Sequence, residues 1–258
     1  AYVDANGKIY YSERGRIRTV DQDGKIRTVM GSGYSSGDGG AATSARFGGI
    51  TDLKLWNDGT HDRVVVGDSA EYRIREFEIG GNVQTVAGTG ANSIPDTVSP
   101  AANQPIYLHT GGEIADIRFA VDPSNGTIYC GYRDGQKISK IDRSTGKWVD
   151  LVGTGGSTYW DDPAADGKTG SQVLLNGYLP QIVDSDGTRL YSFHGKYLSS
   201  SMLKTYAVAD GTQGALVGVQ GSYGPLPADG TPGTSATIRS LRSGVWDAYA
   251  SRFAFIID

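Results

Sequence analysis

Ionisable residues follow each copy of a short apolar strand that recurs along the chain, and several of them could meet if the copies converge. In chain order, these residues are Glu13, Asp68, Tyr132, His194 and Asp258. Two carboxylates and a histidine brought to one axis could bind a divalent cation or act as a general acid and base. The competing interpretation is that carboxylates at strand ends cap turns, as Asp68 beside Ser69 would.

Histidine is scarce, because the chain contains only His61, His109 and His194. His61 lies in an Asp-Gly turn, where we expect it to be solvated, and His109 lies in a loop that could reach an axial opening. If a metal ion is bound, we expect some of Asp68, His109 and His194 to hold it; otherwise we expect no cofactor. The sequence has no HExxH, P-loop or paired-cysteine motif, which argues against a zinc enzyme.

Aromatic residues also occur in the polar segments between the expected sheets. They are Tyr34, Tyr107, Tyr159, Trp160 and Tyr223. Flat aromatic faces beside short polar side chains suit sugar rings or the hot spots of protein interfaces. Tyr159 and Trp160, followed by Asp161, form the ligand site that we would test first. The alternative is that each ring covers the junction between sheets that its loop crosses.

Two acidic segments, 21–24 and 184–187, begin like calcium-binding loops. Neither is followed by the glutamate at the distance that an EF-hand requires. Both connect expected strands, so we interpret them as hairpin turns.

The elements that must position these residues are internal repeats. The closing glycines of the copies stand at intervals of 57, 65 and 65 residues: Gly31, Gly88, Gly153 and Gly218. A second marker, the first apolar residue of the recurring strand, gives intervals of 55, 64, 62 and 63: Ile9, Val64, Ile128, Leu190 and Phe253. Two markers with similar periods indicate a repeat architecture.

The second copy predicts four strands in a meander. Apolar alternation or β-branched runs occupy 50–56, 63–67, 72–77 and 83–87, and turn signals at 57–59 and 80–82 separate them. Such a sheet hides its apolar faces only by packing against other copies. We therefore expect an all-β protein, a β-propeller of four-stranded antiparallel blades. A β-sandwich gives no reason for the repeat, and a β-solenoid is the remote alternative.

The expected blades number about five, and the last is incomplete. They lie at approximately 1–33, 50–90, 114–156 and 179–221, with a partial blade at 240–258. The two leading strands are present at both ends of the chain, so the usual closure by strands from the two termini does not apply. We expect either a truncated blade or a chain that is part of a longer polypeptide and a larger ring.

The segments between the copies carry a second pattern. Residues 37–47 read Gly-Asp-Gly-Gly-Ala-Ala-Thr-Ser-Ala-Arg-Phe, 72–75 read Tyr-Arg-Ile-Arg, and 85–90 read Thr-Val-Ala-Gly-Thr-Gly. Looser copies of the first segment run from Pro100 to Leu108, from Ala165 to Leu175 and from Ala228 to Ile238. This pattern resembles the NHL-repeat family of β-propellers over nearly the whole chain, which implies one propeller domain over 1–258. The family includes receptor ectodomains, ligand-binding modules of bacterial surface and phage virion proteins, and a minority of lyases and lactonases.

Composition narrows the function classes. The chain has 258 residues, 38% of them hydrophobic and 20% charged, which is typical of a folded protein, and its 38 glycines suit many turns. The net charge of −4 and the lack of a large Lys/Arg cluster argue against nucleic acid, and no apolar run is long enough for a membrane span. Cys130, the only cysteine, lies in an apolar strand where we expect it to pack as a small hydrophobe.

These observations favour a non-catalytic recognition or scaffold module. We expect it to belong to a larger extracellular, cell-surface or virion assembly, to bind glycan or protein through loop aromatics, and to contact neighbouring domains or subunits. The alternative is an NHL-like lyase or lactonase with a metal ion at the propeller axis.

Overall fold

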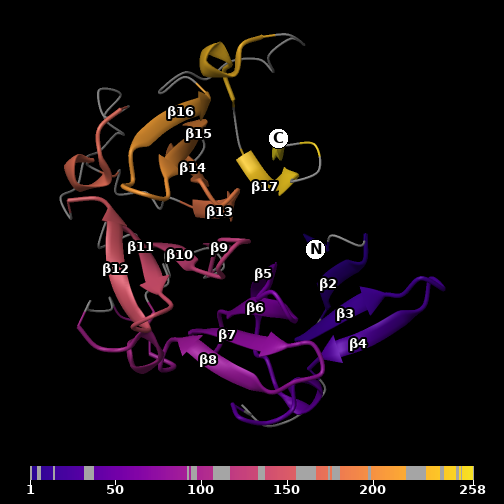
Figure 1. Ribbon diagram of the computed structural model, residues 1–258. Helices are drawn as coiled ribbons and strands as arrows, with labels where there is room; N and C mark the ends of the chain where they lie inside the picture. The colour runs from indigo at the N-terminus through magenta and orange to yellow at the C-terminus, as the bar shows by residue number, and fades with distance from the viewer. Residues whose placement is uncertain are drawn as a thin grey trace. The chain divides into compact units, whose positions relative to one another are not determined.

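The computed structural model describes most of the chain (Figure 1). The described residues are 2–4, 7–13, 15–31, 38–91, 93, 98–106, 117–132, 137–154, 167–173, 175, 181–196, 199–218, 231–238, 241–247, 250 and 252–257. Among them, the regular elements are β-strands and short 3-10 helices, with no α-helix. No helix in this described part is long and apolar enough to cross a membrane.

The chain divides into two compact units. Unit 1 comprises residues 1–127 and 141–148, and unit 2 comprises residues 128–140 and 149–258. The expectation of a single domain over 1–258 stays a prediction.

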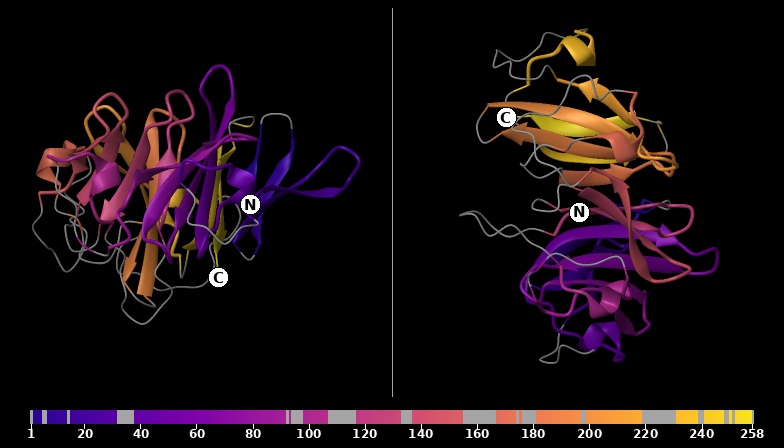
Figure 2. Two further views of the ribbon diagram at one scale, coloured as in Figure 1. Left: turned by 90° about the horizontal axis from the view of Figure 1, so that it is seen from below. Right: turned by 90° about the vertical axis from the view of Figure 1, so that its left-hand side faces the viewer.

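The strands form antiparallel meanders, as the sequence predicts, with the strands of each sheet running next to one another (Figure 2). The first sheet contains β1 (Tyr2–Val3), β2 (Ile9–Glu13), β3 (Arg16–Val20) and β4 (Ile26–Met30). The second contains β5 (Ile50–Asn57), β6 (Asp62–Asp68), β7 (Arg73–Glu78) and β8 (Val83–Ala87). In both sheets the spatial order of the strands follows the sequence.

Three more sheets follow along the chain. The third contains β9 (Phe119–Val121), β10 (Ile128–Tyr132), β11 (Lys137–Asp142) and β12 (Lys147–Val152). The fourth contains β13 (Gln181–Ser185), β14 (Arg189–Lys196), β15 (Ser199–Ala207) and β16 (Gln213–Val217). The fifth pairs only β17 (Leu241–Asp247) with β18 (Arg252–Ile257) among the described strands. The expected four complete sheets and one two-stranded sheet are confirmed.

The sheets bury their apolar faces against one another within each unit. In unit 1, Tyr10, Ile17 and Met30 of the first sheet share a core with Val64 and Phe77 of the second. In unit 2, Tyr191 of β14 stacks on Phe253 of β18 with ring centroids 4.5 Å apart, and on Trp246 of β17 at 5.5 Å. Removal of this surface from water is a main source of stability for repeated sheets.

The glycine that ends each four-strand copy has a structural reason. All four closing glycines have positive φ, between 83° and 104°: Gly31, Gly88, Gly153 and Gly218. Each donates its backbone N–H to the carbonyl of the first residue of the next 3-10 helix, at 2.9–3.1 Å. These helices are η1 (Ala42–Ser44), η2 (Ala101–Asn103), η4 (Gly170–Gln172) and η5 (Gly233–Ser235). The repeated glycine therefore turns the chain from the outer strand into the next connection.

Each connection then buries an apolar residue five positions after the helix begins. These residues are Phe47, Ile106, Leu175 and Ile238. We expected the second copy of this segment to run from Pro100 to Leu108. That end was wrong by two residues, because Ile106 takes the place of Phe47 in this connection. Leu108 lies outside the described residues.

Candidate functional site

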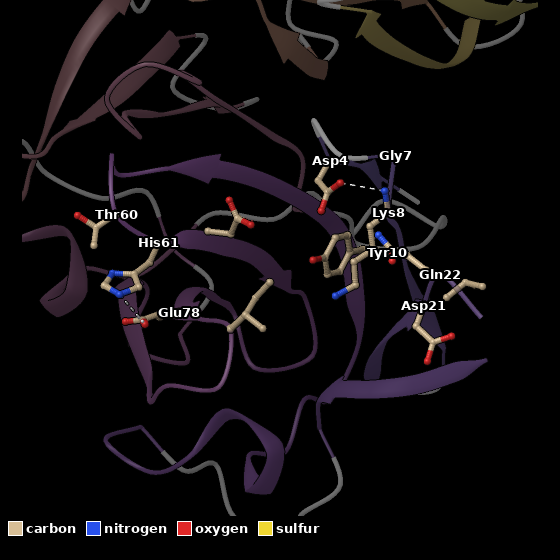
Figure 3. Close-up of a pocket in the computed structure, with 12 residues that line it drawn as sticks. Asp4, Gly7, Lys8, Tyr10, Asp21, Gln22, Thr60, His61 and Glu78 are labelled. Atoms are coloured by element: carbon tan, nitrogen blue, oxygen red, sulfur yellow. Dashed lines mark hydrogen bonds and ion pairs between the residues drawn. The ribbon is translucent and has the colours of Figure 1, made fainter. Parts of the chain in front are cut away.

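A polar pocket of about 590 Å³ lies in unit 1, between turns of the first and second sheets (Figure 3). Its walls come from the β1–β2 and β3–β4 turns on one side and from the β5–β6 and β7–β8 turns on the other. The lining residues are Asp4, Gly7, Lys8, Tyr10, Val20, Asp21, Gln22, Thr60, His61, Asp62, Glu78 and Ile79.

Tyr10 forms the buried base of one wall. The residue is 1% exposed, and Lys8 Nζ lies 5.2 Å from the centroid of its ring. Burial, the negative charges of Asp4 and Asp62, and a hydrogen bond to Asp4 together raise the pKa of Tyr10 to about 12. The Tyr10 phenol therefore stays protonated at neutral pH and is held in place by Asp4.

His61 forms the other wall with Glu78. His61 Nε2 lies 3.4 Å from Glu78 Oε1, and both side chains remain partly exposed. The turn that carries His61 is fixed by Asp58, whose Oδ1 accepts the N–H groups of Thr60 and His61. These bonds and the bond from Arg63 lower the pKa of Asp58 to about 2. The expected exposure of His61 is confirmed, and the structure adds its carboxylate partner.

The pocket can bind a small polar molecule and exchange a proton with it. Imidazoles accept protons near neutral pH, and a carboxylate that accepts from one ring nitrogen leaves the other available as a base. Asp4, Asp62 and Glu78 supply acceptors for hydroxyl groups, and Lys8 supplies a donor. Asp21 is held by its own turn, because it accepts from Lys25 N at 2.7 Å and pairs with Arg27.

Asp68, a candidate metal ligand from the sequence, lies at the other end of the strand that begins with Asp62. Its buried carboxylate accepts the N–H groups of Gly48 and Gly49 at 3.1 and 3.0 Å, and lies 3.7 Å from Arg75. Burial raises the pKa of Asp68, and the two backbone hydrogen bonds oppose that rise. These donors face the carboxylate, which thereby fixes the segment that enters β5 rather than the turn at Ser69; a role of Asp68 as a metal ligand stays a prediction.

The same network explains the basic residue at the end of the Tyr-Arg-Ile-Arg segment. Arg75 is fully buried, donates to the carbonyl of Arg46 at 2.8 Å and lies 5.1 Å from the Phe47 ring centroid. Its Nε lies 3.4 Å from Asp38. The family-like pattern in this copy therefore holds the connection between sheets.

His194, the second candidate ligand, is buried on β14. Its Nε2 lies 3.1 Å from the hydroxyl of Tyr206 on β15. His109, the third candidate, lies outside the described residues. No group of three or more His, Cys, Asp or Glu side chains that could hold a metal ion occurs among the residues that the structure describes.

The ligand-binding residues expected from the sequence stay predictions. Tyr34, Tyr107, Tyr159, Trp160, Asp161 and Tyr223 all lie outside the described ranges. Of the strand-end series, Glu13 pairs with Arg18 at 3.1 Å, whereas the side chain of Tyr132 and all of Asp258 are also outside the described part.

The turn interpretations fit the structure. Asp21 begins the β3–β4 turn, and Asp186 begins the β13–β14 turn, where its Oδ1 accepts from the N–H groups of Thr188 and Arg189. Asp184 differs from the expectation, because it lies in β13 and accepts the N–H of Trp246 at 2.8 Å. Cys130 is buried in β10, as expected.

Sequence reasoning missed the pocket. Asp4 and Tyr10 belong to the first copy and Glu78 belongs to the second, so they line one pocket only because the two sheets pack side by side. The available signal was the series of Asp- and Gly-containing turns, which we interpreted as connections alone.

Solved structures share the fold of this chain. No family model and no curated protein matches the sequence. A protein of unknown function from Bacteroides thetaiotaomicron is 15% identical, with a TM-score of 0.54 over 94% of this chain and 52% of its own. A gluconolactonase from Xanthomonas campestris is 15% identical, with a TM-score of 0.54 over 99% of this chain and 67% of its own. The chain thus spans only about half of the first protein. At these sequence identities, the similarity shows only the fold. With its four-stranded antiparallel sheets, the chain is a β-propeller.

Proposed function

We propose that this protein is a β-propeller of the NHL type and an enzyme of the lactonase or lyase type that acts on a small polar molecule. The observation that supports it most is the fold shared with a gluconolactonase over 99% of the chain. The pocket adds support, because its volume of about 590 Å³ falls in the range of roughly 300–1,000 Å³ typical of small-molecule sites.

Lactone hydrolysis is the reaction that the pocket residues suit best. In this proposal His61 donates its Nε2–H to Glu78, and Nδ1 takes a proton from a water molecule as the water oxygen attacks the lactone carbonyl. The ring C–O bond then breaks, and the proton moves from His61 to the departing ring oxygen, which gives a hydroxy acid. Tyr10 and Asp4 form a fixed wall against which the hydroxyl groups of the substrate are oriented.

The test is turnover of a panel of sugar-acid lactones by the purified chain, followed as proton release in weakly buffered solution. We expect hydrolysis that falls on His61→Gln and on Glu78→Gln. Asp23→Asn is the matched control, because Asp23 is an exposed carboxylate in the β3–β4 turn that does not line the pocket. Absence of turnover, or equal turnover in all variants, would overturn the assignment.

Recognition without chemistry is the second candidate. It is supported by the contacts of Asp68, whose carboxylate accepts two backbone N–H groups as a structural residue would. In this proposal, Tyr159, Trp160 and Asp161 bind glycan or protein within an extracellular or virion assembly. Replacing Tyr159 and Trp160 by alanine should then abolish binding to a glycan array and leave Tm nearly unchanged; a large loss of Tm would identify them as packing residues.

A further inference from the structure

Four polar side chains are buried on one face of the fourth sheet, in unit 2. Ser192 and His194 come from β14, and Lys204 and Tyr206 come from the neighbouring β15. Each is at most 2% exposed. A buried ammonium and a buried hydroxyl both need partners, since loss of water hydrogen bonds is otherwise uncompensated.

The strand register puts these residues on the same face. Leu190 pairs with Tyr206, Ser192 with Lys204, and His194 with Met202, in three successive rows. Because side chains alternate between faces, Tyr191 and Phe193 point to the opposite face, where they pack against Phe253. The Cβ atoms of directly opposed residues such as Ser192 and Lys204 are about 4.5–5.5 Å apart.

The hydrogen bond between His194 and Tyr206 crosses the middle row. Tyr206 belongs to the row on one side of Ser192 and Lys204, and His194 belongs to the row on the other side, on the opposite strand. Their bond of 3.1 Å therefore runs diagonally over the Ser192–Lys204 pair. The Ser192–Lys204 pair thus lies between the two residues that form this bridge.

In the described part of the chain, protein groups do not supply the hydrogen-bond and ion-pair partners that the middle row, Ser192 and Lys204, needs. Ser192 Oγ has no hydrogen-bond partner. Lys204 makes no ion pair with any described carboxylate, although it is 1% exposed. Two buried donors, one of them an ammonium, are thus opposed by no negative charge among the described residues.

We propose that Ser192 and Lys204 bind a small monovalent anion, such as chloride, beneath the His194–Tyr206 bridge. The Ser192 hydroxyl and the Lys204 ammonium both donate to the anion, which satisfies the hydroxyl and neutralises the buried charge. A cation would be repelled by Lys204, and water alone would leave its charge uncompensated. This site is independent of the pocket in unit 1 and of the activity proposed for it.

The test measures Tm of the full chain at constant ionic strength while sodium methanesulfonate is replaced by sodium chloride or bromide. We expect Tm of the unchanged protein to rise and to saturate, as binding to the folded state requires. Ser192→Ala and Lys204→Met should abolish the rise. Lys204→Met keeps the length of the side chain and removes the charge, so it should still fold. Lys25→Met, at an exposed turn residue, is the control and should keep the rise.

Bromide also provides a direct readout in crystals of the unchanged protein. An anomalous peak beside Ser192 and Lys204 is expected. The proposal is overturned if Tm does not depend on the anion, if both variants keep the same rise, or if bromide is absent from this face. Should Lys204→Met fail to fold, Ser192→Ala and the bromide peak still decide the question.

Discussion

Gly88 lies so close to the backbone carbonyl of Tyr72 that a Cβ atom on Gly88 would stand 2.1 Å from that oxygen. Its φ of 100° also belongs to a region that L-residues rarely adopt. Contact and conformation together explain why this closing position requires glycine in the second copy.

Replacement of Gly88 by alanine should therefore destabilise the protein by about 3 kcal/mol or more, because both strain and a backbone clash result. Gly80→Ala is the matched control: Gly80 has φ 86°, but a Cβ there would meet nothing within 4 Å. It should lose only about 1–2 kcal/mol. Urea unfolding of both variants measures the difference, and equal losses would show that the clash is relieved by backbone movement.

Replacement of Arg143 by lysine should destabilise the protein. Its guanidinium donates to both carboxylate oxygens of Glu76, at 3.2 and 2.8 Å, and to the carbonyl of Gly126, and it lies over the ring of Trp56. A lysine cannot reproduce the two parallel bonds, so Arg143→Lys should cost about 2 kcal/mol. Arg63→Lys, at an exposed pair with Asp58, should cost less than about 1 kcal/mol. Similar losses in the two variants would contradict this account.

The raised pKa of Tyr10 predicts that the protein loses stability at alkaline pH. Its folded-state pKa of about 12 is above the reference value of 10.0, so the unfolded chain loses this proton first. The contribution of protonated Tyr10 to the free energy of unfolding is fully present below pH 10 and is lost as pH rises from 10 through about 12. Tyr10→Phe should remove this part of the pH dependence, whereas Tyr11→Phe, at the neighbouring position on β2, should retain it. Denaturant unfolding between pH 8 and 12 checks both variants.

Asp68 should behave as a structural residue. Asp68→Asn replaces an acceptor oxygen by an amide donor opposite Gly48, Gly49 and Arg75, and should cost about 2–3 kcal/mol. We expect no accompanying change in the metal content of the purified protein, measured by plasma mass spectrometry. Loss of a stoichiometric ion in this variant would restore Asp68 as a ligand.

His61 and Glu78 should control turnover with little effect on folding. His61→Gln should lower kcat for lactone hydrolysis by about 10²-fold or more, because the general base is removed. Both side chains are partly exposed, so Tm should change by less than about 2 °C. A large loss of Tm together with activity would mean that the turn, and not the base, had been removed.

Local patterns along the sequence were sufficient to predict the strands of the sheets. Strand β8 covers the expected residues 83–87, β5 is longer than expected by one residue at its end, and β6 is longer by one residue at each end. The turns at Asp21 and Asp58 carry the side-chain bonds that Asp-Gly sequences favour. Alternation and turn chemistry act between residues a few positions apart, so they can be read from one chain. The closing glycines were recognised by their spacing, and their positive φ supplies the cause.

The sequence by itself thus determined the repeated four-strand unit and the propeller class. Only the tertiary structure decided which polar groups are used within the fold and which face a cavity. Asp68 and Asp62 stand at opposite ends of β6, about 20 Å apart at roughly 3.3 Å per residue, and the first binds backbone amides while the second lines the pocket. Similarly, the burial of Ser192 and Lys204 depends on strand register. These outcomes depend on contacts between residues far apart in the chain, which no local pattern records.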